Sequence, residues 1–184
     1  MVLRFNAAQQ IMNAFGGQFP ATQGRLIFVK PGTGNDGNSG ATPARAVKTL
    51  VQAHALATAN QNDIVVLMAE SNTAAATTDY QSSTLTWSKD GVHLIGVNAG
   101  PLLGQRSRIA LISTYVTLAP MVTWSANGCF VSGIEFFAGV ARAVPLGGLH
   151  LTGPRRGFRK CHIAGSGHAY RAIPGPHHPH PAAA

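Results

Sequence analysis

Three short segments of the chain share one arrangement of hydrophobic residues, with apolar side chains at the first, fourth and sixth positions: 92–97, 131–136 and 158–163. The second and third segments begin at Val131 and Phe158, a spacing of 27 in the numbering. The first segment begins at Val92, a spacing of 39 before the second, which corresponds to one period plus an insertion of 12. A fixed period of this size is typical of stacked repeats, each of which buries its apolar face against the next.

Residues just upstream of the repeats keep the same spacing of 27. These pairs are Val122 with Leu149 and Trp124 with Leu151. Short strands at this interval indicate a mainly β chain that rises as a parallel β-helix, with Val92, Val131 and Phe158 lying over one another. An ordinary β-sandwich whose strands happen to be alike is the alternative.

The chain before the repeats alternates strands with one helix. Residues 25–30 and 63–68 are apolar runs that predict buried strands. Between them, Thr42 and Pro43 predict the start of a helix over residues 44–58, with Thr as its cap and Pro at the first helical position. Helical spacing predicts one buried face on it, formed by Val47, Leu50, Val51 and His54.

Both ends of the chain and one internal segment differ from this pattern. Residues 5–15 predict a short amphipathic helix, and the polar residues 70–83 are expected to have little regular structure. Residues 166–184 are rich in Pro, His and Ala and cannot continue a β ladder. We therefore divide the chain into an N-terminal helix, arm and linker at 1–24, a β domain with its capping helix at 25–165, and an extended C-terminal arm.

The start of the chain resembles that of pectate-lyase-like right-handed parallel β-helix proteins of tailed-bacteriophage particles. The likeness covers roughly residues 25–165 once the repeats are included. The residues that carry it are 27–37, Thr42 and Pro43, 46–50, 62–65 and 89–96. The resemblance implies a short right-handed parallel β-helix whose N-terminal α-helix caps the open end of the coil, and it implies a homotrimer. Such proteins usually have many coils, whereas this chain has about three.

Composition adds that the surface carries few charges. Apolar residues make up 45% of the chain, but charged residues only 11%, well below the usual quarter. Such surfaces are common in extracellular β proteins and in subunits of larger assemblies. No apolar run is long enough to predict a membrane span. The two cysteines, Cys129 and Cys161, make no disulfide framework and fit small buried hydrophobes at nearly equivalent places in adjacent repeats.

The net charge of +8 lies mostly toward the C-terminus, because residues 136–184 hold six Lys or Arg residues and no acidic residue. This basic part lacks the interleaved aromatic residues that stack on bases, so we do not expect nucleic acid as a partner. We interpret it as a contact surface, together with the apolar stripe of residues 5–15. The predicted subunit contacts are Phe5, Ile11, Met12, Phe15, Arg155, Arg156, Arg159 and Arg171.

A glycine-rich loop after the first strand has the spacing of a dinucleotide-binding loop at Gly32, Gly34 and Gly37. The helix begins too late for this function, and Glu70 stands far beyond the distance of about 20 positions past Gly37 at which the acidic residue is expected. Turn formation also explains the loop better than calcium binding does, because its oxygen-bearing residues lack the alternation of a calcium loop. Those residues are Asn35, Asp36, Asn38 and Ser39. We predict no cofactor site.

The acidic residues are too scattered to predict polysaccharide cleavage. A glycosidase needs two carboxylates that face one cleft. Glu135 is the only acid within the repeats at 131 and 158, and it alternates outward between Ile134 and Phe136 with no visible partner. No acid or cysteine accompanies the C-terminal histidines, so we predict neither a native metal nor a catalytic residue. These histidines are His168, His177, His178 and His180.

We therefore predict a non-enzymatic structural protein of a bacteriophage virion, either a head decoration (cement) protein or a tail appendage subunit. It is expected to act through contacts with other virion proteins and with copies of itself. A carbohydrate-binding or polysaccharide-depolymerising tail appendage is the alternative, with Trp87, Trp124 and Tyr115 as its candidate aromatic platform. A dinucleotide-binding enzyme is a third hypothesis, with less support.

Overall fold

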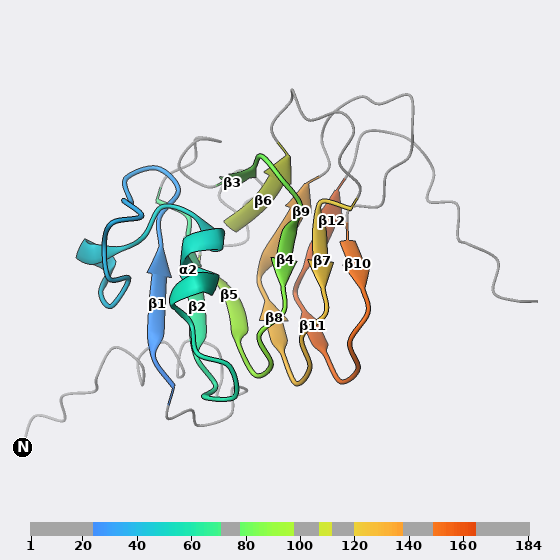
Figure 1. The fold of residues 1–184 in the computed structure, drawn as a ribbon. Helices are drawn as coiled ribbons and strands as arrows, with labels where there is room; N and C mark the ends of the chain where they lie inside the picture. The colour runs from blue at the N-terminus through green and yellow to red at the C-terminus, as the bar shows by residue number, and fades with distance from the viewer. Residues whose placement is uncertain (1–23, 71–77, 98–106, 112–119, 138–148, 165–184) are drawn as a thin grey trace, which may run out of the picture.

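The computed structural model, shown in Figure 1, describes residues 24–70, 78–97, 107–111, 120–137 and 149–164. These residues form a mainly β structure with a single α-helix. That helix is too short to cross a membrane. The predicted helix over 5–15 and the arm at 166–184 lie outside the described residues. So do five of the predicted contact residues: Phe5, Ile11, Met12, Phe15 and Arg171.

The described part of the chain begins with a strand, a 3₁₀ turn and the helix, and continues almost entirely as short strands. The 3₁₀ turn is η1 (Pro43–Arg45) and the helix is α2 (Leu50–Leu56). The strands are β1 (Leu26–Val29), β2 (Ile64–Met68), β3 (Thr78–Gln81), β4 (Leu85–Trp87), β5 (His93–Val97), β6 (Ser107–Leu111), β7 (Val122–Trp124), β8 (Phe130–Ser132), β9 (Ile134–Phe137), β10 (Leu149–Leu151), β11 (Gly157–Arg159) and β12 (His162–Ala164).

The strands form three sheets in which each pair of neighbours is parallel. Sheet A has the order β1-β2-β5-β8-β11, sheet B the order β3-β6-β9-β12, and sheet C the order β4-β7-β10. From β4 onward the chain passes three times through sheets C, A and B, and we term each pass a circuit. Successive circuits lie side by side (Figure 1), so the predicted mainly β structure is confirmed in its parallel sheets.

The predicted period is confirmed for all three strands of the last two circuits. The register pairs Val122 with Leu149, Val131 with Phe158 and Phe136 with Ile163. A constant spacing in the sequence thus corresponds to one complete circuit, because each residue meets its equivalent one period later. Repeated spacing was therefore a sound guide to which residues lie together.

The predicted register of the first repeat is shifted along the strand. Val131 pairs with Leu94, and not with Val92 as predicted. Side chains on a strand alternate with a period of two, so a shift from Val92 to Leu94 keeps the same face and fits the hydrophobic pattern equally well. The correct spacing is present in the similar triplets Leu85–Trp87 and Val122–Trp124, which the structure pairs.

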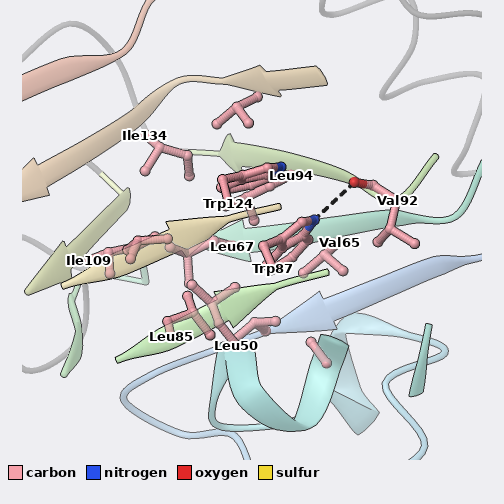
Figure 2. Close-up of a cluster of buried hydrophobic side chains, with 14 of the residues drawn as sticks. Leu50, Val65, Leu67, Leu85, Trp87, Val92, Leu94, Ile109, Trp124 and Ile134 are labelled. Carbon is pink, nitrogen blue, oxygen red and sulfur yellow. Dashed lines mark hydrogen bonds between the residues drawn. The ribbon is translucent and has the colours of Figure 1, made fainter. Parts of the chain in front are cut away.

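The core between the sheets contains a column of rings, of which Figure 2 shows Trp87 and Trp124. Trp87 and Trp124 occupy equivalent places in β4 and β7, are fully buried, and stack with their ring centroids 4.8 Å apart. The ring centroid of His54 in α2 lies 4.9 Å from that of Trp87, and the ring centroid of Phe158 in β11 lies 5.9 Å from that of Trp124. Aromatic pairs of this kind add about 0.5–1.5 kcal/mol each beyond the burial of their area. The column therefore ties α2 to all three circuits.

A corner with a left-handed backbone precedes each strand of sheet A from β2 onward. Positive φ angles occur at Asn62, Gly91, Gly128 and Arg155, and the strand register places these four residues in one row. Gly and Asn adopt this conformation at the lowest cost, which explains their use at three of the four corners. The row fixes where each circuit turns into sheet A.

The helix is shorter than predicted and is capped by a different residue. Thr49 accepts a hydrogen bond from the backbone N–H of Gln52 (3.2 Å) at the start of α2, whereas the Thr42 side chain makes no capping bond. The Asp36 carboxylate accepts hydrogen bonds from the backbone N–H groups of Lys48 and Thr49. Val47 forms an extended bridge with β1 and Thr49 is itself extended, so the α-helix begins only after them.

The predicted buried face of the helix differs from the structure at two residues, Val51, which is exposed, and Val47, which is buried but lies before the helix. Val47 and Leu50 are fully buried and His54 is partly buried, but Val51 is 53% exposed. Val47 reaches the core from an extended segment that bridges to β1, so Leu50 and Ala53 alone set the inward face of α2. Val51 follows Leu50 directly and therefore points about 100° away around the helix axis.

The polar segment 70–83 contains a strand where little structure was predicted. β3 joins the edge of sheet B, and its Asp79 is buried at a position that pairs with the core residue Ile109. The Asp79 carboxylate accepts hydrogen bonds from the backbone N–H of Leu50 (3.2 Å) and from the Gln81 side chain. Asp79 stands on this inward face in place of an apolar residue because it binds the first turn of α2, and Gln81 in turn binds Asp79.

Candidate functional site

The two ends of the stack of circuits differ. At the first end, α2 covers the circuits and buries Leu50 and Ala53 against them. At the other end, β10, β11 and β12 are each the outermost strand of their sheet, and no strand among the described residues pairs with their outer edges. We term these three strands the last circuit. Unpaired strand edges offer backbone N–H and C=O groups to another chain, so the last circuit is the candidate interaction site.

Two apolar side chains extend the core columns into solvent at this end. Leu151 pairs with Trp124 and Ile163 pairs with Phe136, and both of these partners are at most 1% exposed. Leu151 is 46% exposed and Ile163 is 49% exposed. A further layer of polypeptide would bury both residues, as each circuit buries the one before it. Among the described residues, Val51 is the other large apolar side chain with such exposure.

The last circuit is also strongly basic. Residues 149–164 include Arg155, Arg156, Arg159 and Lys160 and contain no acidic residue. The structure thus brings together three of the predicted contact residues. Four cations beside an apolar strand edge favour a partner that supplies both negative charge and apolar area.

Arg156 differs from its neighbours because part of its guanidinium group is buried. It follows Arg155 in the left-handed corner and occupies the place of the buried Cys129 one circuit earlier. Its Nε and Nη2 atoms are inaccessible to solvent and have no hydrogen-bond partner. A Cβ atom at Gly153 would lie 2.9 Å from Nη2 and 2.3 Å from the carbonyl oxygen of Ser125, so the glycine leaves the space that this side chain occupies.

The prediction that Glu135 points outward without a partner is wrong in its second part. Glu135 is nearly fully buried, accepts a hydrogen bond from Arg108 Nε (2.9 Å), and lies 3.4 Å from His162 Nδ1. The Arg108 guanidinium also lies over the ring of Phe137, 5.1 Å from its centroid. The repeat period places Arg108, Glu135 and His162 in one row. Glu135, the one acidic residue within the repeats at 131 and 158, is therefore engaged in an ion pair with Arg108.

The glycine-rich loop forms hydrogen-bonded turns, as its composition predicts. Asn35 Oδ1 accepts a hydrogen bond from the backbone N–H of Gly37 (2.8 Å), and Asn38 Nδ2 donates one to the carbonyl of Ala46 (2.9 Å). Glu70 accepts hydrogen bonds from the backbone and hydroxyl of Thr33. At the start of α2, Asp36 and Asp79 occupy N–H groups that a phosphate would need. Two carboxylates there oppose the binding of a dinucleotide.

Two of the three residues of the candidate aromatic platform are not at the surface. Trp87 and Trp124 are fully buried in the core, and Trp87 Nε1 donates a hydrogen bond to the carbonyl of Val92 (3.0 Å, Figure 2). Tyr115 lies outside the described residues, as do His168, His177, His178 and His180. Within the described part of the chain, no three His, Cys, Asp or Glu side chains are grouped closely enough to hold a metal ion.

The two cysteines are separate thiols within the stack. Cys129 is buried, as predicted, and Cys161 is partly buried against the same core. They do not occupy equivalent places, because the register puts Cys161 opposite Ile134. Burial raises the pKa of both thiols, so neither is activated as a nucleophile.

Sequence reasoning placed Leu151 and Ile163 in the repeat but did not identify their exposure. The repeat spacing marks both as core positions, and they would be core if another circuit followed. The available signal was the end of the repeat pattern after Ile163.

Comparisons with protein-family models, curated proteins and solved structures find no match to this chain.

Proposed function

We propose that the protein is a structural subunit of a bacteriophage virion, either a head decoration protein or a tail appendage, that acts through its last circuit. The observation that carries the proposal is the exposure of Leu151 and Ile163, where the core columns end with no further layer formed by the described residues. Exposed apolar residues on unpaired strand edges mark a surface that another polypeptide covers. A subunit that works by assembly needs such a surface and needs no catalytic group.

The finer fold that we infer is a short right-handed parallel β-helix of three circuits, capped by α2. The constant order of the sheets, the parallel pairing and the row of left-handed corners support it. Connections between parallel strands of one sheet are right-handed in about 98% of cases. The sequence resemblance to phage β-helix proteins then favours a virion over other assemblies. The partners that we infer are other virion proteins and copies of this chain, which would form a trimer.

The carbohydrate-binding or depolymerising appendage has less support. Its aromatic candidates Trp87 and Trp124 are core residues, and Glu135 is held by Arg108 and His162. Incubation with capsular or lipopolysaccharide glycans distinguishes the two functions. New reducing or unsaturated ends would favour the enzyme, whereas unchanged glycans are expected for the structural subunit.

Sedimentation velocity of the purified chain tests whether the last circuit is a contact surface. We expect association to increase at about 1 M salt, because charges are then screened beyond about 3 Å and the cations no longer repel. The double variant Leu151→Lys/Ile163→Lys should remain dissociated under the same conditions. Val51→Lys is the matched control, since Val51 is equally exposed but lies on α2, and it should associate like the unsubstituted chain.

A chain that stays monomeric at every salt concentration would contradict contacts between copies of the chain through the last circuit. An equal loss of association in the Val51→Lys control would contradict the assignment of these contacts to the last circuit. The virion assignment needs a separate test: the chain should copurify with phage particles through density-gradient centrifugation, and a particle reconstruction should locate it.

A further inference from the structure

We propose that the partner of the last circuit is an extended acidic segment of a different protein, which pairs with the strand edges and places a carboxylate on Arg156. This inference rests on the proposed function, because it names the chemistry of the occupant of the same surface. It is carried by three observations: two buried guanidinium nitrogens without a partner, a basic surface around them, and a chain whose own carboxylates are all engaged.

The unpartnered guanidinium is the first observation. An arginine side chain stays charged at all physiological pH values, and a buried charged donor without an acceptor is costly. Arg156 keeps Nε and Nη2 buried and unpaired, with Nη2 in the space that the absent side chain of Gly153 leaves, so a partner carboxylate meets these atoms when the side chain swings outward. A carboxylate accepts two parallel hydrogen bonds from such a group, which suits the geometry of a guanidinium better than a point contact.

The chain itself has no side-chain carboxylate to spare for this role. It contains six acidic residues, and the described residues include all of them. Each accepts a hydrogen bond within its own domain: Asp36, Asp63, Glu70, Asp79, Asp90 and Glu135. Residues 165–184 carry Arg171 and no acidic residue, so no side chain of the C-terminal segment can supply a carboxylate to Arg156 either.

A second copy of the chain is a poorer occupant than an acidic partner. Two last circuits that met face to face would bring four Lys or Arg residues from each copy together. At the opposite end of the stack, the segment around Val47 already bonds to the outer edge of β1, and α2 packs beside β1 and β4, so a second copy stacked head to tail would meet this segment and α2. Charge complementarity therefore favours a partner that carries Asp or Glu.

An extended peptide is also favoured over nucleic acid. Leu151 and Ile163 present apolar area beside the strand edges, which an added β-strand buries through its alternating side chains. A strand in which acidic and apolar residues alternate would place the acids on one face and the apolar residues on the other. Nucleic acid would use the cations alone and leave the apolar positions uncovered.

Calorimetric titration of the whole chain with two short synthetic peptides tests this inference. In one peptide Glu alternates with Val along an extended strand, and the other has Gln in place of Glu. We expect the Glu peptide to bind at least about ten-fold more tightly, because a charge-assisted hydrogen bond to a buried group is lost with Gln. Equal affinity for both peptides, or no binding of either, would overturn the inference.

Variants at Arg156 locate the binding and guard against misfolding. Arg156→Met should weaken binding of the Glu peptide at least about ten-fold, while Arg45→Met, at an exposed arginine of η1, should change it less than two-fold. The free Arg156→Met chain should unfold at the same or a higher temperature than the parent, because an unpaired buried charge is removed. An unchanged affinity for the Glu peptide in Arg156→Met would overturn the assignment to this residue.

The outcomes also separate this inference from the proposed function. If Leu151→Lys/Ile163→Lys abolishes association but the Glu peptide does not bind, the last circuit remains a contact surface and the acidic partner is wrong. If neither experiment responds, the contact surface itself is wrong. Tighter binding of duplex DNA or polyuridylate than of the Glu peptide would replace the peptide partner by a nucleic acid.

Discussion

At the scale of single residues, two ionisable side chains beside α2 have pKa values shifted toward their neutral forms. Burial raises the pKa of Asp79 to about 7, and its hydrogen bonds from Leu50 and Gln81 offset only part of that rise. Burial lowers the pKa of His54 to about 4, and the nearby charge of Lys89 adds to the effect. These two groups affect stability in opposite ways: the raised pKa of Asp79 lowers stability as pH rises, and the lowered pKa of His54 lowers stability as pH falls.

The pH dependence of stability should show both groups. Folded Asp79 holds a proton between about pH 4 and 7 that the unfolded chain has released, so its contribution is present below pH 4 and is lost as pH rises. Folded His54 lacks a proton that the unfolded chain binds below about pH 6.5, so its contribution is lost as pH falls toward 4. In the unsubstituted chain these two slopes partly cancel.

Single substitutions separate the two slopes. With Asp79→Asn, stability should rise more steeply with pH between 4 and 7 than in the unsubstituted chain, because nothing then offsets the His54 slope, to which the lowered pKa of His93 adds. With His54→Gln, the rise should be smaller than in the unsubstituted chain, because the Asp79 slope then opposes the His93 contribution without that of His54. Urea denaturation followed by circular dichroism at several pH values measures both, and identical pH profiles for the two variants would refute the assignment.

At the scale of elements, successive circuits approach closely where β5 passes β8. A Cβ atom at Gly96 would lie 2.1 Å from the carbonyl oxygen of Gly133, which itself has a positive φ of 69°. The backbones at this corner are therefore packed more closely than any side chain allows. The glycine at position 96 is required by Gly133, its neighbour in space on the next circuit, and not by its own backbone angle.

Alanine substitutions test this contact between circuits. Gly96→Ala should destabilise the protein by more than Gly128→Ala, which has open space around its Cβ position and meets only left-handed strain of about 1–2 kcal/mol. The midpoints of urea unfolding compare the two variants. A smaller effect at Gly96 than at Gly128 would show that the circuits do not touch there.

Sequence reasoning succeeded for elements whose spacing is constant. It failed where a contact depends on a residue that is distant in the sequence. The repeat period located the strands of the last two circuits, but the alternation of side chains along a strand concealed the shift between Val92 and Leu94. The start of α2 depends on Asp36, a loop residue that no local pattern connects to Thr49. The burial of Asp79 depends in the same way on a helix end that lies far earlier in the chain.

At the scale of the whole molecule, the described residues form a stack of circuits that carries α2 at one end and ends in the unpaired edges of the last circuit at the other. The basic character of the last circuit was visible in the sequence, and so was its place in the repeat. The unpaired guanidinium of Arg156 was not, because it depends on the corner at Arg155 and on the space left by Gly153. The account of function depends on this difference between the two ends.

Hydrogen exchange on the free chain, followed by mass spectrometry, tests that difference most directly. Backbone amides of β5 and β8 lie between two neighbouring strands, whereas β10, β11 and β12 have a neighbour on one side only among the described residues. We predict that the last circuit exchanges at least about ten-fold faster than β5 and β8, because it opens without disrupting the rest of the stack. Equal protection of β5, β8 and the last circuit in the free chain would contradict an open docking end.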